Sequence, residues 1–201
     1  MRSVMLSIQP KWCELIASGK KTVEIRKTKP KLETPFKVYI YCSSIARVNL
    51  DEYTKIFRAT NGRIDDWHGK VIGEFVCDEI KRIHCQSIEK EAICAIAVGN
   101  GDKEYYDNSC VSYKEAYRYL RNVKKAYGWH ISDLVIYDKS KELSEFFKYC
   151  GDDPKCEGCE AFHYSNTESG KEECCCSVVY GCRPLKRPPQ SWCYVEGGEQ
   201  K

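Results

Sequence analysis

The stretch SIQPKWCELIASGKKTVEIRK, residues 7–27, decides the fold, because it holds a helix start, a helix end and a strand within about twenty residues. Pro10 stands where a first helical turn tolerates a missing N–H group. Gly19 stands where a left-handed residue can end that helix. The residues between them predict a helix over 10–18, and its apolar side chains share one face. These side chains are Trp12, Cys13, Leu15 and Ile16.

After Gly19 the sequence predicts a strand over residues 21–27. Side chains alternate between the two faces of a strand, so Val23 and Ile25 share one face and polar residues share the other. A rigid strand holding a row of polar side chains is a favourable base for a binding or catalytic site. The candidate site residues are Lys20, Lys21, Thr22, Glu24 and Arg26.

These residues resemble the opening of the ASCH domain family, whose members are small β-barrels related to the PUA fold. Two later segments agree with this resemblance: WHISDL at residues 129–134, followed by YDK at 137–139, and RPPQSWCYVE at 187–196. Together the three segments resemble the phage-related and bacterial branch of the family, which carries a cysteine-bearing tail. The resemblance spans nearly the whole chain, with its weakest support over residues 50–115.

The remaining patterns predict an α+β protein with many short strands and two or three helices, which fits a PUA-like small mixed β-barrel. Residues 1–148 are the predicted ASCH domain. Residues 149–201 are a predicted loop-rich, cysteine-containing extension whose last strand, 192–195, rejoins the barrel. The predicted elements are strands at 3–8, 36–42, 71–77 (continuing toward Ile83) and 129–137, a helix or loop over 50–60, a helix from Ser112 to about Lys125, and a short turn or helix at 143–147.

Composition sets the broad class of the protein. Of 201 residues, 42% are hydrophobic, which suffices for a globular core. No apolar run approaches the about 20 residues of a membrane span, and the first residues lack a signal-peptide pattern, so we expect a cytoplasmic protein without a membrane partner. The net charge is only +3, but residues 1–40 hold nine Lys or Arg against three Glu, a local charge of +6. This local charge favours an anionic ligand, although a solvated charged surface is the alternative.

The polar strand face has three interpretations. Lys and Arg can bind phosphate, with Glu24 accepting from a base edge or positioning Arg26. A lysine with a lowered pKa can instead act as a base or nucleophile, with a carboxylate as proton shuttle. The structural alternative is an ion pair between Glu24 and Arg26 that contributes little at a surface.

The family resemblance favours the first two interpretations. It implies a cleft beside this motif and RNA or a modified nucleoside as the ligand, with Trp129 and His130 as further ligand-binding residues from a barrel strand; packing is the alternative for both. One bacterial branch is an amidohydrolase that removes the acetyl group from acetylcytidine-type nucleosides through a lysine, a threonine and a glutamate. Lys21 matches that lysine, but Glu24 stands at the threonine position, which argues against this activity. If the reaction occurs, Lys21 and Glu24 are its catalytic candidates, and Glu115 is a further candidate for the glutamate.

The predicted helix that begins at Ser112 mixes tyrosines with cations, a combination found in single-strand nucleic-acid binding. Tyr113, Tyr117 and Leu120 recur at helical spacing, however, so we predict that these three side chains face the core.

Eight of the 14 cysteines lie in the last 52 residues, which favours a metal site over disulfides in a cytoplasmic protein. Cys156 and Cys159 have the spacing of a zinc knuckle. The predicted zinc ligands are Cys150, Cys156, Cys159 and Cys182, with Cys174, Cys175 or Cys176 as alternatives to Cys182, and His163 as a weaker candidate. Free thiols, disulfides, an iron–sulfur cluster and redox sensing remain alternatives. Cys13, Cys42 and Cys77 lie in apolar patterns and are predicted core residues.

Three functions follow from these observations. The first is binding of RNA or a nucleotide-like ligand beside the Gly19–Arg26 motif. The second is hydrolysis of an acylated nucleoside. The third is a non-catalytic protein–protein interaction module that uses the cysteine-containing extension.

Overall fold

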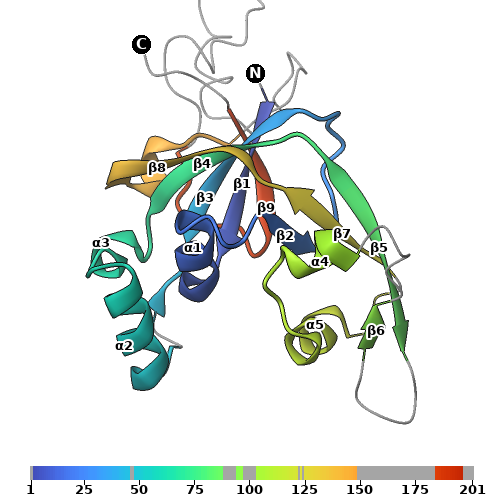
Figure 1. Ribbon diagram of the computed structural model, residues 1–201. Coiled ribbons are helices and arrows are strands. Elements are labelled where there is room, and N and C mark those ends of the chain that lie inside the picture. Colours follow the sequence, from blue (N-terminus) through green and yellow to red (C-terminus); the bar gives the residue numbers. More distant parts are fainter. Residues whose placement is uncertain are drawn as a thin grey trace, which may run out of the picture.

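The computed structural model describes residues 2–45, 48–87, 94–96, 103–121, 123, 125–148 and 184–196. These residues form a mixed α+β fold with two sheets and several short helices (Figure 1), as the sequence predicts. Among them, no helix combines the length and the apolar character needed to cross a membrane.

The larger sheet has five strands in the order β8-β4-β3-β1-β9. Its centre is the parallel pair β1 and β3, and the other pairs are antiparallel. The strands are β1 (Arg2–Ile8), β3 (Phe36–Cys42), β4 (Val71–Cys77), β8 (Ser132–Lys141) and β9 (Trp192–Glu196).

The smaller sheet has four strands in the order β2-β7-β5-β6, so β2 is an edge strand. No ladder joins the two sheets among the described strands, and the predicted closure into one barrel is therefore not confirmed. The strands are β2 (Val23–Arg26), β7 (Lys125–His130), β5 (Ile80–Ser87) and β6 (Cys94–Ile96).

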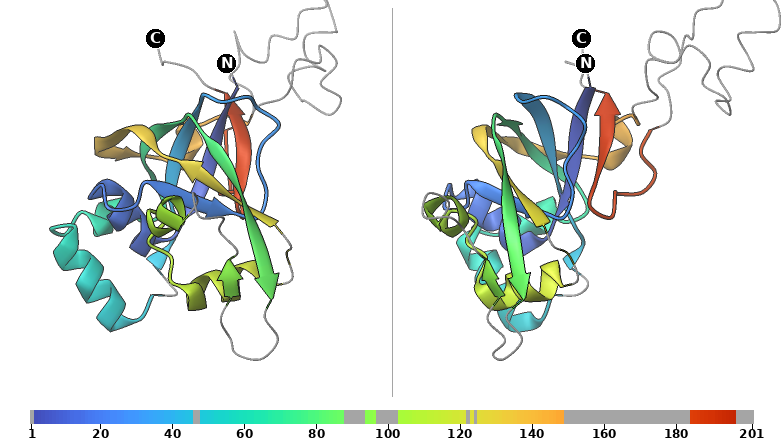
Figure 2. Two further views of the ribbon diagram at one scale, coloured as in Figure 1. Left: turned by 45° about the vertical axis from the view of Figure 1, so that its right-hand side comes forward. Right: turned by 90° about the vertical axis from the view of Figure 1, so that its right-hand side faces the viewer.

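The helices divide into two groups around the sheets. In Figures 1 and 2, α1 lies against the five-stranded sheet next to α2 and α3, whereas α4 and α5 lie with the four-stranded sheet. The helices are α1 (Pro10–Ala17), α2 (Leu50–Ala59), α3 (Ile64–Trp67), α4 (Lys103–Asp107), α5 (Tyr113–Leu120) and the 3₁₀ turn η2 (Leu143–Glu145).

The two-residue period of the strands distributes their side chains among three cores. Along β1, Val4 and Leu6 pack toward α1 in the main core, whereas Met5 packs on the opposite face. Along β2, Ile25 packs toward α4 and α5, so Glu24 and Arg26 point the other way, toward the five-stranded sheet. The predicted core cysteines Cys13, Cys42 and Cys77 are buried, as expected.

The sequence prediction was wrong at three boundaries. The strand predicted at 71–77 does not continue toward Ile83, because β4 ends at Cys77 and Ile80 begins β5 of the other sheet. The helix after Ser112 ends at Leu120 rather than near Lys125, because the chain enters β7 there. The single strand predicted over 129–137 is two strands, β7 and β8, that belong to different sheets and meet at Ile131. The apolar pattern continues through this corner, so periodicity alone does not reveal it. Helices α3 and α4 and strand β6 were not predicted.

The predicted core-facing stripe of α5 is confirmed at Leu120 and wrong at Tyr117, while the side chain of Tyr113 lies outside the described part of the structure. Leu120 is buried beneath α5 together with Ala116, whereas Tyr117 is exposed.

The described structure resumes at Pro184, beside Phe147. Phe147 and Pro184 form an antiparallel bridge, and the Leu185 amide donates to the Phe146 carbonyl at 2.8 Å. From there the chain leads into β9, which pairs with β1. The last of the described strands, β9, is therefore part of the same sheet as the first, β1.

Candidate functional site

The motif is built by the end of α1 and the turn that follows it. Pro10 opens the helix, and Gly19 adopts a φ of 74°, a left-handed conformation that suits glycine. The amide of Lys21 then donates to the Leu15 carbonyl at 2.9 Å, which directs the Lys21 side chain inward before β2 begins.

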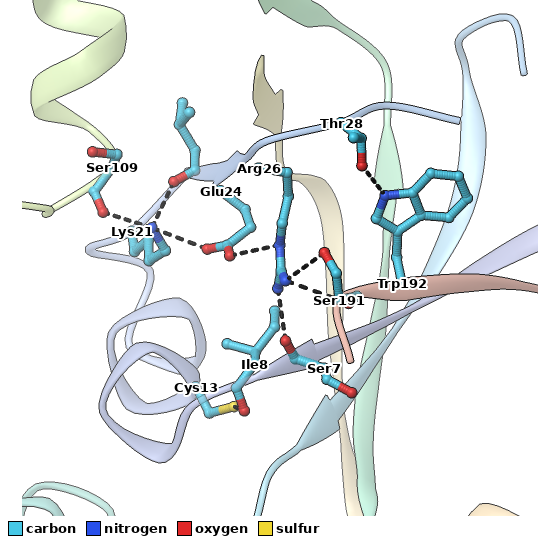
Figure 3. Close-up of polar contacts among 11 residues, drawn as sticks. Ser7, Ile8, Cys13, Lys21, Glu24, Arg26, Thr28, Ser109, Ser191 and Trp192 are labelled. Carbon is cyan, nitrogen blue, oxygen red and sulfur yellow. Dashed lines mark hydrogen bonds and ion pairs between the residues drawn. The ribbon is translucent and has the colours of Figure 1, made fainter. Parts of the chain in front are cut away.

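Lys21 is fully buried, with 1% of its surface exposed. Its Nζ donates to the backbone oxygens of Val23 and Ser109 at 2.8 and 2.6 Å, and it lies 3.1 Å from Glu24 Oε2 (Figure 3). An ammonium group has three N–H donors, so these three oxygens satisfy it completely. Burial of the charge is possible because each donor has a partner.

Glu24 links Lys21 to Arg26. Its Oε1 lies 3.0 Å from Arg26 Nε, although the N–H direction is not aligned for a hydrogen bond. The other nitrogens of Arg26 donate to the Ser7 carbonyl at 2.8 Å and to the carbonyl and hydroxyl oxygens of Ser191 at 3.3 and 3.4 Å. Figure 3 shows this chain of contacts across the interior. We call these three side chains the Lys21–Glu24–Arg26 network.

The network also fixes the segment that carries α4 and α5. The amides of Thr22 and Val23 donate to the Asn108 carbonyl at 3.0 and 3.2 Å, next to the Ser109 carbonyl that accepts from Lys21. On the surface, Lys11 of α1 forms an ion pair with Glu115 of α5. Lys21 is therefore a positioning residue for this helical segment.

The other predicted site residues lie around the network in different settings. Lys20 is exposed and Thr22 is half-buried. Trp129 is the cross-strand neighbour of Glu24, but its ring is fully buried against Phe36, and its Nε1 has no hydrogen-bond partner. His130 lies partly exposed at the end of β7, where its Nδ1 is 2.7 Å from Asp78 Oδ1.

Glu115 lies outside the Lys21–Glu24–Arg26 network. One of its oxygens pairs with Lys11, and the other accepts from the amide and hydroxyl of Ser112 in the capping box of α5. Burial raises the pKa of Glu115, but the hydrogen bonds from Lys11 and Ser112 outweigh it and lower the pKa below its usual value.

This lowered pKa predicts a small acid-sensitive contribution to stability. The folded-state pKa lies below the unfolded-state value, so the contribution is present above the unfolded pKa of about 4.3 and is lost as the pH falls through the folded value. Glu115→Gln keeps a polar capping group but removes the charge. We expect it to lower the free energy of unfolding by about 0.5 kcal/mol at neutral pH, with a difference that shrinks as the pH falls below about 4. Urea denaturation of both proteins across this range tests it, and a pH-independent difference would contradict it.

The predicted zinc ligands Cys150, Cys156, Cys159, Cys174, Cys175, Cys176 and Cys182, and also His163, lie outside the described residues. Within the described part of the chain, no group of three His, Cys, Asp or Glu side chains has the geometry to hold a metal ion. The zinc site stays a prediction from sequence.

Several partners of the network were missed by sequence reasoning. The partners of Lys21 and Arg26 are mostly backbone oxygens, which belong to Ser7, Val23, Ser109 and Ser191. Every residue has a backbone carbonyl, so the residue types do not identify these partners. The mixture of tyrosines and cations around α5 was the only sequence signal that pointed to this region.

The arrangement favours binding over chemistry at Lys21. A lysine whose three N–H groups are satisfied has no free position for a substrate. The exposed cations of the same segment are available instead: Lys20, Lys27, Lys29 and Lys31.

Comparison with known proteins identifies the family. The similar solved structures include ASCH from Zymomonas mobilis, with 19% identity over 71% of this chain and 77% of that one and a TM-score of 0.47. A tyrosine-to-phenylalanine mutant of the same protein gives 18% identity over 70% and 76%, with a TM-score of 0.46. No curated protein matches. The model of the ASCH domain matches residues 6–197, nearly the whole sequence, and the chain therefore belongs to the ASCH domain family.

Proposed function

We propose that this ASCH domain binds RNA, or another nucleotide-like anion, on the surface beside the Gly19–Arg26 motif. The proposal rests on how charged side chains from the Gly19–Arg26 motif to residue 31 are distributed between the interior and the surface. The buried charges pair with one another in the Lys21–Glu24–Arg26 network. From residue 20 to residue 31, every exposed charged side chain is positive. These side chains belong to Lys20, Lys27, Lys29 and Lys31.

These four lysines have no acidic partner in the described structure. No described carboxylate lies within ion-pair distance of any of them, in contrast to Lys11, Lys37 and Lys70. Unneutralised positive charges on one segment attract a polyanion and bind its phosphates. The buried network fixes β2 between Lys20 and Lys27.

The family membership supports the same conclusion, because ASCH domains resemble PUA-like RNA-binding modules. The structure also supports this choice over the amidohydrolase alternative. That reaction needs Lys21 as base or nucleophile, and here its ammonium is enclosed by Val23, Glu24 and Ser109.

The test is RNA affinity as a function of salt. Lys27→Gln combined with Lys29→Gln is expected to weaken binding of a short single-stranded oligoribonucleotide. It should also reduce the slope of log affinity against log salt concentration by about 0.7 for each phosphate that the protein no longer binds. Fluorescence anisotropy on the labelled oligonucleotide measures both quantities.

The matched control is Lys55→Gln combined with Lys139→Gln, which removes the same charge from exposed positions on α2 and β8. This control should leave the affinity and the slope close to those of the wild type. Equal effects of the two double variants would show that only net charge matters. Absence of RNA binding by the wild type at low salt would overturn the proposed function.

A further inference from the structure

Tyr119, near the end of α5, lies beside the proposed RNA-binding surface with an exposed ring. Tyr119 is 40% exposed. Lys27 Nζ lies 5.1 Å from the centre of the ring. Tyr119 therefore places a partly exposed ring next to one of the lysines proposed to bind phosphate.

The ring lies near the buried network: burial raises the pKa of Tyr119, and the charge of Arg26 lowers it in part. Helix α5 is anchored by buried Ala116 and Leu120 and by its capping box at Ser112. A ring that is already ordered loses little conformational entropy when a ligand stacks on it.

A second pair follows two residues along the same segment. Lys29 Nζ lies 6.0 Å from the ring centre of Tyr127, which is half-buried on β7 directly opposite Arg26. Alternation of a cation with an aromatic ring is the arrangement by which proteins bind unpaired nucleotides: the ring stacks on a base and the cation binds the phosphate. Bases inside a duplex are already stacked on one another and cannot use such a ring.

We propose that Tyr119 and Lys27 form a subsite for one unpaired base and its phosphate, so that this surface binds single-stranded rather than double-stranded RNA. The inference rests on the proposed function and adds to it the strand state of the RNA and the residue that recognises it. Lys29 and Tyr127 extend the subsite toward the next nucleotide.

The experiment compares Tyr119→Ala with the wild type on two probes, a single-stranded oligoribonucleotide and a blunt duplex of the same length. Loss of one stacked base is expected to weaken single-strand binding by about 5- to 150-fold and to leave the weaker duplex binding unchanged. Tyr119→Phe keeps the ring and should lose far less affinity. Tyr117→Ala is the matched control, because Tyr117 is an exposed tyrosine on the same helix with no role in the subsite. Urea denaturation confirms that all variants are folded.

The outcomes separate this inference from the proposed function. If Tyr119→Ala leaves single-strand binding unchanged while the Lys27 and Lys29 variant weakens it, the subsite is wrong and the RNA-binding surface stands. Equal losses on single strand and duplex, or equal losses for Tyr117→Ala, would also overturn the subsite. If the wild type binds neither probe, both proposals fail together.

Discussion

Lys21→Met is expected to lower the free energy of unfolding by about 3–5 kcal/mol, because it leaves Glu24 as a buried charge without its lysine. The carbonyl oxygens of Val23 and Ser109 lose their donor in the same step. Methionine nearly fills the space of the lysine stem, so the effect measures loss of the charge rather than loss of volume. Urea denaturation gives the difference directly.

Lys20→Met is the matched control, since Lys20 is the exposed neighbour and its replacement should cost no more than about 0.5 kcal/mol. A double-mutant cycle with Glu24→Gln adds a second criterion. The two changes remove one interaction between contacting groups, so their costs should fall short of additivity by about 1–3 kcal/mol. A loss below about 1 kcal/mol for Lys21→Met would contradict the role assigned to this ammonium.

The buried position of Lys21 affects how a loss of RNA binding is interpreted. Lys21 fixes the segment of α4 and α5 through the Ser109 carbonyl, and α5 carries Tyr119. A variant of Lys21 that no longer binds RNA could therefore have lost the position of α5 rather than a direct interaction with the ligand. Variants of the exposed Lys27 and Lys29 avoid this ambiguity, which is why they carry the functional test.

Gly73→Ala is the second substitution with a large expected effect. Gly73 lies in β4 opposite Ile136 of β8, and an added Cβ would lie 2.3 Å from the Val135 carbonyl oxygen and 3.1 Å from the Ile136 Cα. These neighbours are backbone atoms that cannot rotate away, so the β4–β8 ladder must separate. We expect a loss of about 3 kcal/mol or more. Urea denaturation measures this loss, and faster amide exchange along β8 would locate it.

Gly128→Ala provides the comparison. There the nearest atom, 2.6 Å from the added Cβ, belongs to the Tyr105 ring, and the next belong to the side chains of Val23 and Ile83. Side chains can shift, so the expected loss is smaller, about 1–2 kcal/mol. If Gly128→Ala proved more costly than Gly73→Ala, the close approach of β4 and β8 would not be the constraint inferred here.

The sequence predicted the alternation of β2 correctly but not the burial of its charged face. Periodicity places Glu24 and Arg26 on one side of the strand, and that is where they lie. What buries them comes from far along the chain: Arg26 contacts Ser191 at a separation of 165 residues, and Lys21 contacts Ser109 at a separation of 88. A charged side chain is usually exposed. The local sequence pattern does not show that backbone oxygens from residues so distant in the chain contact Lys21 and Arg26.

The corner at Ile131 and the face of α5 were missed for a related reason. Apolar residues on both sides of the corner satisfy one continuous strand pattern, although tertiary pairing assigns them to two sheets. In α5 the sequence pattern predicted tyrosines on the core-facing side, whereas Ala116 is the residue buried there beside Leu120. In both cases tertiary packing, which local periodicity does not encode, decides which residues are buried.

The bridge between Phe147 and Pro184 has a consequence for the evolution of the chain. Since residues 147 and 184 already lie side by side in the described fold, a change in the number of residues between them does not require β1 and β9 to move. Sequence changes between these two positions can therefore leave the pairing of β1 with β9 intact.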